Sequence, residues 1–260
     1  MLLVHGAFAD ASSWSGVIAV LHSISIEVIA PANPLRGLPS DARYIASVAD
    51  EIDGPKILVG HAYGGAVITV AGALAENVTG LVYVSGFALD AGESILDVSA
   101  RFPESLLAAV LRPARFTDRE GGSAVELYVD REAYPRVFAG DLPAPIAAVA
   151  ASAQRPITQT GFEDRVSVAA WRTLPSWYVL ATADRAISPD AQRFMAVRAR
   201  ATTVEVDASH AVATSQPQVV ADQITVAALS VRRAVPGPMS GDRDPKPNPP
   251  DQRGNRKRNP

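Results

Sequence analysis

The chain has 260 residues, 48% of them hydrophobic and 20% charged, a composition typical of a globular protein with one sizeable core. Cysteine is absent, which excludes disulfides and thiolate metal sites, and no apolar run approaches the roughly 20 residues that a membrane span requires. Residues 232–260 hold eight lysines and arginines against three aspartates, so the remainder carries a net charge of −8, which argues against nucleic-acid binding because phosphate contacts need clustered cations.

Six short β-rich segments alternate with helical patterns along most of the chain. The predicted strands span residues 1–4, 26–30, 56–59, 80–84, 177–181 and 202–206, and the predicted helices lie near residues 12–22, 40–51, 66–75, 189–199 and 216–229. This alternation predicts the α/β class, with a mostly parallel six-stranded sheet that is covered by helices on both faces.

Two segments depart from the alternation. Residues 88–170 contain no convincing strand-helix-strand unit, and we interpret them as an inserted, mainly helical cap. The helical patterns of this insertion span residues 103–111 and 143–154, and a short Val-Glu-Leu-Tyr-Val run spans 125–129. Residues 232–260 contain seven prolines and few apolar side chains, so they cannot offset their ordering entropy and are predicted to form a disordered basic tail. Residues 1–231 are expected to form one domain.

The first residues bear on location. Met1–Val4 are followed at once by His5 and Gly6, which leaves no room for the apolar core of a signal peptide. We therefore expect a cytoplasmic protein without a membrane partner. Because the chain begins inside a predicted strand, we also expect a segment upstream of Met1.

The sequence GHAYGG at residues 60–65 joins the third predicted strand to the helix that follows it. A strand, a tight glycine turn and a helix are typical of a nucleophile elbow, in which the central residue of G-x-S-x-G is a serine on a strained turn. Here the centre is Ala62, whose methyl group cannot attack a substrate.

Several candidate residues follow the ends of different predicted strands. His5–Ala7 follow the first strand, Ala62 the third and Ser85 the fourth, whereas Asp184 and His210 follow the fifth and sixth. Ligands of an open parallel sheet bind outside the carboxyl ends of its strands. We therefore expect these residues to converge at one edge of the sheet.

Each of these residues has a functional and a structural interpretation. His210 is predicted to be a mobile base, with a structural loop histidine as the alternative. Asp184 would orient the imidazole and stabilise the imidazolium, or else only cap a helix. The backbone N–H groups of Ala7 and Tyr63 are placed to form an oxyanion hole. His5 and the histidine of the elbow are expected to bond to backbone.

Five segments together resemble the α/β-hydrolase fold family, in particular the compact branch of bacterial esterase-like proteins, plant methylesterases and hydroxynitrile lyases. They are VHGAFADASSW, GHAYGGAVI, YVSGFALDAGES, ATADRAISPDAQRFMA and DASHAVATSQPQVVADQI, and the resemblance covers residues 1–230. It implies a three-layer fold with a cap and a carboxylic-ester hydrolase-type site. By this resemblance Ala62 stands at the nucleophile position, Asp184 is the acid and His210 is the base, with oxyanion amides from Ala7 and Tyr63.

Three explanations of the alanine remain open. It is engineered to trap a bound ester, it is natural in a binding protein that keeps the pocket, or the His–Asp pair drives base chemistry that needs no nucleophile. Ser85 and Ser209 are weak candidates for a substitute nucleophile because neither occupies an elbow. We expect a small ester or carbonyl compound as partner, with no cofactor and no metal. The glycine turn lacks the Lys-Ser/Thr of a phosphate loop.

Overall fold

The structure is a computed structural model that describes residues 1–102, 104–118 and 121–234. Its centre is a parallel sheet of five strands in the order β1-β2-β3-β7-β8. These strands are β1 (Leu2–Val4), β2 (Lys56–His61), β3 (Val78–Val84), β7 (Ser176–Ala181) and β8 (Thr202–Val206). The predicted α/β class with a parallel sheet is confirmed.

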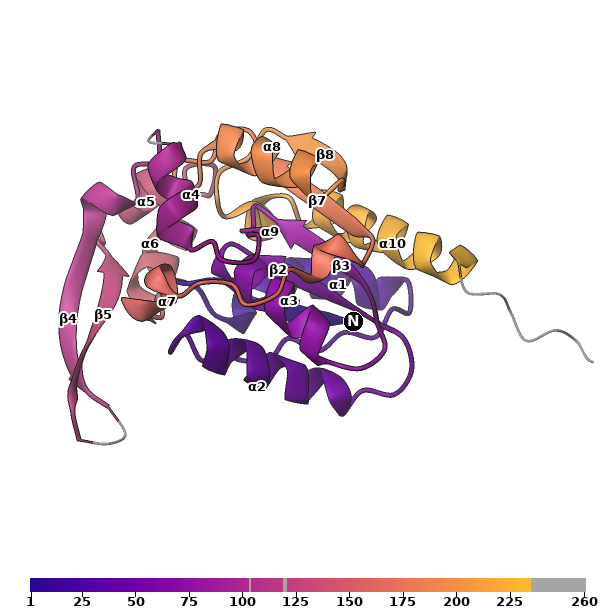
Figure 1. The fold of residues 1–260 in the computed structure, drawn as a ribbon. Helices are drawn as coiled ribbons and strands as arrows, with labels where there is room; N and C mark the ends of the chain where they lie inside the picture. Colours follow the sequence, from indigo (N-terminus) through magenta and orange to yellow (C-terminus); the bar gives the residue numbers. More distant parts are fainter. Residues whose placement is uncertain (103, 119–120, 235–260) are drawn as a thin grey trace, which may run out of the picture.

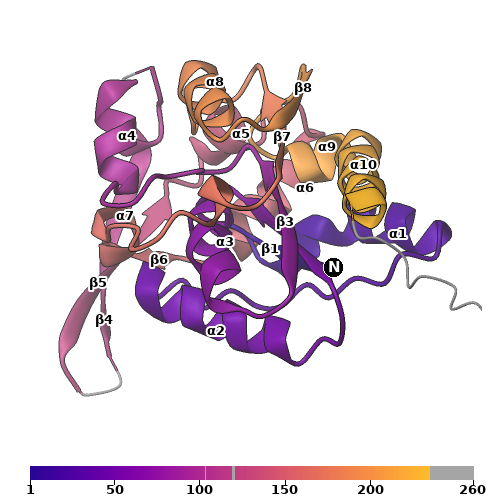
Figure 2. The same cartoon turned by 45° about the vertical axis from the view of Figure 1, so that its right-hand side comes forward.

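Helices cover both faces of this sheet (Figures 1 and 2). One face packs against α1 (Ser15–Ser23) and α10 (Pro217–Ala234), and the other against α2 (Leu38–Asp50), α3 (Tyr63–Leu74) and α8 (Pro189–Arg198). Short turns η1 (Ala11–Trp14) and α9 (Val212–Ser215) lie beside α1. The alternation seen in the sequence is therefore a three-layer arrangement.

The predicted strand at residues 26–30 is wrong in extent. Only Ile29 pairs with the sheet, in a single parallel bridge to Leu2 at the free edge of β1. The ladder stops there because Pro31, the next residue in register, has no N–H to donate. The sheet consequently has five strands rather than six.

The segment between β3 and β7 contains several helices, as predicted, and also strands that were not predicted. It contains an antiparallel sheet of β4 (Leu111–Thr117), β5 (Ser123–Val129) and β6 (Ile157–Thr158). Its helical elements are α4 (Ile95–Arg101), η2 (Ala108–Val110), α5 (Tyr134–Phe138), α6 (Ala144–Ala153), α7 (Thr160–Glu163) and η3 (Ala170–Arg172). Figures 1 and 2 show β4 and β5 projecting as a long hairpin beside the main sheet.

Of the helix predicted at 103–111, only the short 3-10 helix η2 forms among the described residues, whereas the one predicted at 143–154 corresponds to α6. Ser105 and the following Leu106 instead bond to the chain near Asp184: Ser105 Oγ donates to the Ala186 carbonyl at 2.7 Å, and the Leu106 N–H donates to the Arg185 carbonyl at 2.8 Å. These tertiary contacts override the helix propensity of an Ala/Leu-rich sequence.

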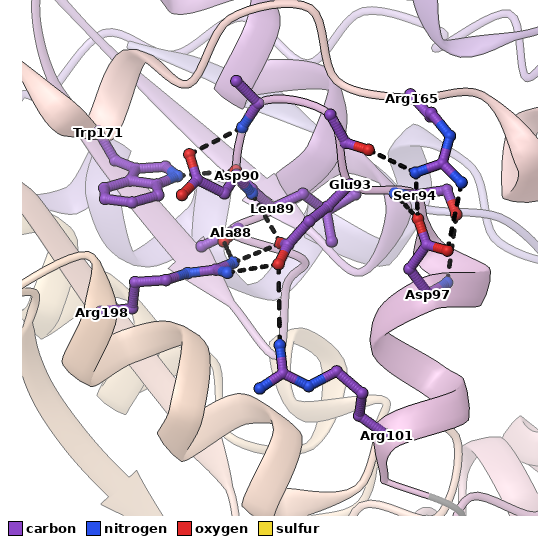
Figure 3. A network of polar contacts seen from close by, with 12 residues as sticks. Ala88, Leu89, Asp90, Glu93, Ser94, Asp97, Arg101, Arg165, Trp171 and Arg198 are labelled. Atoms are coloured by element: carbon purple, nitrogen blue, oxygen red, sulfur yellow. Dashed lines mark hydrogen bonds and ion pairs between the residues drawn. The ribbon is translucent and has the colours of Figure 1, made fainter.

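Ion pairs hold the two ends of this insertion in place: the segment that leaves β3 and the segment that returns to β7 (Figure 3). The Arg198 guanidinium, at the end of α8, donates to both carboxylate oxygens of Glu93 at 2.7 Å and to the Ala88 carbonyl at 3.0 Å. Arg165 reaches Asp97 at 2.6 Å from the returning segment. The insertion is thereby held against α8, close to the acid loop described below.

The end of the described chain lies in α10, which includes residues 232–234 of the predicted tail. Residues 235–260 lie outside the described residues, and the proposed division into domain and tail stays a prediction. Within the described part of the chain, every helix falls short of the length and apolar character that a membrane span requires.

Candidate active site

Ala62 occupies a strained turn between β2 and α3. Its backbone has φ 50° and ψ −121°, a region that residues with a side chain rarely adopt. The flanking glycines are needed for close approach: a Cβ on Gly60 would lie 2.4 Å from the Gly64 carbonyl oxygen, and one on Gly64 would lie 2.3 Å from the Val4 oxygen. The turn therefore has the geometry of a nucleophile elbow.

The loop after β1 lies directly against this turn. A Cβ on Gly6 would lie 2.7 Å from the Ala62 Cβ and 3.3 Å from the Tyr63 nitrogen. Tyr63 is the first residue of α3, so its N–H has no acceptor within the helix. Within the described part of the chain, the Ala7 N–H donates no hydrogen bond. Both proposed oxyanion donors are consequently free to bind a ligand.

His5 positions this loop and stays neutral. Its Nε2 accepts the Asn33 N–H at 3.0 Å, so Nδ1 carries the proton and donates to the Gly6 carbonyl at 2.8 Å. Burial lowers the pKa of His5 to about 4. The predicted bonding of His5 to backbone is confirmed.

His210 and Asp184 form a buried hydrogen-bonded pair. The His210 Nδ1 lies 2.7 Å from Asp184 Oδ2. Asp184 also accepts the N–H groups of Ala186 and Ile187 at 2.7 and 2.9 Å and the Gln192 amide at 2.8 Å. Because the carboxylate holds the proton on Nδ1, the His210 Nε2 is left as the basic nitrogen.

A small cavity of about 20 Å³ brings the predicted site residues together. It is lined by Ala7, Ala62, Tyr63 and His210, whereas Asp184 lies behind the imidazole and contacts it by the hydrogen bond above. The remaining wall is apolar and consists of Phe8, Phe87, Leu107, Phe138, Phe162 and Ile187. A cavity of this size holds about one water molecule. The residues converge as expected, and their chemical roles stay proposals.

The two serines considered as substitute nucleophiles do not line this cavity. Ser85 is fully buried, has φ 40° and has an Oγ without a partner among the described residues. Ser209 donates its hydroxyl to the Asp141 carboxylate. Neither serine is placed to act on a ligand beside Ala62.

The sequence did not indicate two further contacts of the site. His61 bonds to backbone as expected, but its acceptor is the carbonyl of His210 itself, at 2.9 Å. Burial, reinforced by the neighbouring His210, lowers the pKa of His61 to about 3. The Tyr63 hydroxyl donates to Asp41 Oδ2 at 2.7 Å, and burial raises the pKa of Asp41. An acid near a helix start is usually exposed, so no pattern signals such a buried pair.

Comparison with known proteins agrees with this architecture. The sequence model described as "Alpha/beta hydrolase family" matches residues 1–223. The chain therefore belongs to the α/β-hydrolase family, as its motifs suggested. No curated protein sequence gave a match.

Solved structures show the same fold. A pyrethroid hydrolase from Sphingobium faniae JZ-2 is 22% identical, with a TM-score of 0.73, and the match covers 89% of this chain and 98% of that one. Polyneuridine aldehyde esterase is 17% identical, with a TM-score of 0.74 and coverage of 86% and 97%. Tomato methylketone synthase I, complexed with 2-tridecanone, is 19% identical, with a TM-score of 0.70 and coverage of 88% and 97%. At these identities the likeness concerns the fold alone.

Proposed function

We propose that this protein binds a small carboxylic ester or a related carbonyl compound beside Ala62. The observation that carries the proposal is the convergence of two free N–H groups and a His–Asp pair on one cavity at a strained elbow. The N–H groups of Ala7 and Tyr63 would donate hydrogen bonds to the carbonyl oxygen of the ligand, and each such donor typically stabilises a developing oxyanion by about 3–4 kcal/mol.

The alanine limits which chemistry the site can perform. Formation of an acyl-enzyme needs a hydroxyl or thiol beside the base, and Ala62 has neither. Oxyanion stabilisation and binding alone leave about 10³–10⁴-fold acceleration over water in the serine protease template. We therefore propose that ester hydrolysis is residual, and that His210 and Asp184 serve base chemistry that requires no covalent intermediate.

Decarboxylation of a β-keto acid is a specific candidate for such chemistry. Tomato methylketone synthase I is one of the similar structures, and a histidine variant of it was crystallised with β-ketoheptanoate. A β-keto acid would give its carboxyl proton to the His210 Nε2 and lose CO₂ to leave an enolate, and the enolate carbon would take that proton back from His210 to become a methyl ketone. The two N–H groups would stabilise the enolate oxygen, and no nucleophile takes part.

The alternative function is ligand binding without catalysis. His210→Ala distinguishes the two, because base chemistry disappears with the imidazole while a binding protein keeps its affinity. CO₂ release from a β-keto acid by the unmodified protein, lost in His210→Ala, would support base catalysis. Equal rates with both proteins would contradict it.

A nucleophile-restoring variant tests whether the site is of the hydrolase type. We expect Ala62→Ser to hydrolyse short p-nitrophenyl esters at least 10³-fold faster than the unmodified chain, because the base and the oxyanion donors are already in place. The matched control is Ala62→Ser combined with His210→Ala, which should return to the starting rate. A folded Ala62→Ser protein that is inert toward the whole ester series would overturn the hydrolase-type site.

A further inference from the structure

The cavity beside Ala62 is too small to hold any complete ester or ketone. At about 20 Å³ it has room for a group the size of one water molecule, which suits a carbonyl oxygen but not the rest of a substrate. The remainder must therefore extend into a neighbouring space. Two larger cavities adjoin it and share parts of its wall.

The first neighbouring cavity has a volume of about 230 Å³ and adjoins the wall at Phe8 and Phe138. Its lining combines apolar residues with polar ones such as Asp10 and Ser12, which bond to one another through the Ser12 hydroxyl. This cavity is the smaller of the two and has a mixed lining.

The second neighbouring cavity is larger, at about 590 Å³, and lies within the insertion between β3 and β7. Most of its lining is aliphatic or aromatic, contributed by residues such as Ile95, Leu111 and Leu127. Two of its polar side chains already have partners. Ser105 donates to the Ala186 carbonyl, and the Gln159 amide donates to Glu163 at 2.7 Å. The wall offers a ligand mainly apolar contact, so it fits a hydrocarbon chain.

Three side chains separate this cap cavity from the cavity at Ala62. Phe87, Leu107 and Phe162 line both, so rotation of these side chains is the smallest change that would join the two spaces. A ligand whose carbonyl lies at the oxyanion donors would then direct one substituent into the cap cavity.

We propose that the substrate of this site is a carbonyl compound with an aliphatic chain, and that the chain occupies the cap cavity behind Phe87, Leu107 and Phe162. The inference rests on the proposed carbonyl-binding function and adds the class of substrate and the residues that select it.

A homologous series of methyl ketones, from acetone to 2-undecanone, tests the proposal in the full-length unmodified protein. Methyl ketones carry the carbonyl but have no bond to hydrolyse, so calorimetry reports binding alone. Each methylene transferred from water to an apolar cavity increases affinity about fourfold. We therefore expect the dissociation constant to fall about fourfold per methylene until the cavity is filled.

Two neighbouring alanines provide a matched pair of variants. Ala108 and Ala109 are both exposed in η2, but only Ala108 lines the cap cavity. We expect Ala108→Trp to fill the cavity, to flatten the chain-length dependence and to weaken binding of the longest ketone more than tenfold. Ala109→Trp should keep the slope of the unmodified protein.

The outcomes separate this inference from the function on which it rests. Binding of short and long ketones with equal affinity would overturn the aliphatic-chain proposal and leave carbonyl binding intact. A clear slope that Ala108→Trp does not change would place the chain elsewhere and also overturn it. Failure of every ketone to bind would remove the carbonyl-binding function itself, and this inference with it.

Discussion

Ala62 holds a backbone conformation that alanine avoids, although its methyl group contributes no chemistry. Positive φ values of this kind cost about 1–3 kcal/mol in a residue with a side chain. The strain persists because Gly60, Gly64 and the loop at Gly6 press on the turn from several sides. In a nucleophile elbow this strained conformation projects the central side chain into the site. The same geometry around Ala62 therefore supports a hydrolase-type site, even with alanine at its centre.

Relief of this strain is measurable. Ala62→Gly should increase the free energy of unfolding by about 1 kcal/mol, because glycine adopts positive φ without steric conflict and the gain exceeds its extra unfolded-state entropy. Urea unfolding at neutral pH provides the measurement. The control is Ala66→Gly, at a buried position inside α3, which should destabilise the protein by about 1 kcal/mol or more. A comparable loss in both variants would show that the turn is unstrained.

The buried histidines predict a loss of stability in mild acid. The pKa values of His5 and His61 are lowered to about 4 and about 3 in the folded protein, whereas histidine in an unfolded chain titrates near about 6.5. The unfolded state therefore binds more protons below pH 6.5. Stability that is complete above this pH falls as the pH decreases toward the two folded values, by up to about 1.4 kcal/mol per pH unit for each histidine.

One variant isolates the contribution of His61. His61→Gln keeps a donor for the His210 carbonyl but removes the titrating imidazole. The pH dependence of the unfolding free energy between pH 6.5 and 5 should therefore correspond to about one proton fewer than in the unmodified protein. Urea unfolding at several pH values gives this slope. A slope identical to that of the unmodified protein would mean that His61 is not the group that titrates.

The chain order and the positions of the strand ends were sufficient to predict that Ala62, Asp184 and His210 lie close together. They succeeded because parallel strands direct all their carboxyl ends to one edge. The partners of these residues could not be found in the same way. Gln192 lies on a helix after the acid loop, and Asp41 contacts Tyr63 from another helix, so both depend on how the helices pack on the sheet.

At the scale of elements, α8 connects the site to the insertion. Gln192 near its beginning donates to Asp184 and to the Ile187 carbonyl, at 2.8 and 3.0 Å. Arg198 at its end holds Glu93 and the Ala88 carbonyl. The same helix thus contacts both Asp184, the acid that bonds to His210, and the segment through which the chain enters the insertion.

The Arg198–Glu93 pair should contribute more than an exposed pair on the same helix. Its side chains are only 19% and 22% exposed and its geometry is bidentate, so Arg198→Lys should cost about 1 kcal/mol because lysine cannot form the paired contact. Arg193→Lys is the control, since the Arg193–Glu205 pair is also bidentate but both of its side chains are 44% exposed, where solvent screening limits such pairs to about 0–1 kcal/mol. Thermal unfolding compares the two, and an equal shift would contradict the special role of Arg198.

Elements of the central sheet were easier to predict than those of the insertion. Strands buried on both faces are apolar throughout, and β2, β3 and β7 show most of this signal. The edge strand β8 is more exposed, and its alternating valines indicate a strand with one face toward the core. The hairpin of β4 and β5 has mixed burial and carries Pro113, which β4 tolerates because it is an edge strand. The sequence there resembles a loop or a weak helix, and only pairing with β5 makes it a strand.

At the scale of the whole molecule, the folded core ends within α10. Val231 packs against the core cluster near Gly80, and it is the last described residue to do so. A chain that ends after residue 234 should therefore keep its melting temperature within about 2 °C, because it retains every core residue of the described chain. Differential scanning calorimetry checks this, and a large decrease would show that residues 235–260 stabilise the fold.

The insertion separates two strands that are direct neighbours in the sheet, since β3 pairs with β7. The chain thus leaves the sheet after β3 and returns to it in the neighbouring strand, where Leu81 pairs with Ser176. The entropic cost of closing such a loop increases only with the logarithm of its length. The insertion can accordingly change in length or sequence at little entropic cost to the sheet, because Ala62, Asp184 and His210 all lie outside it.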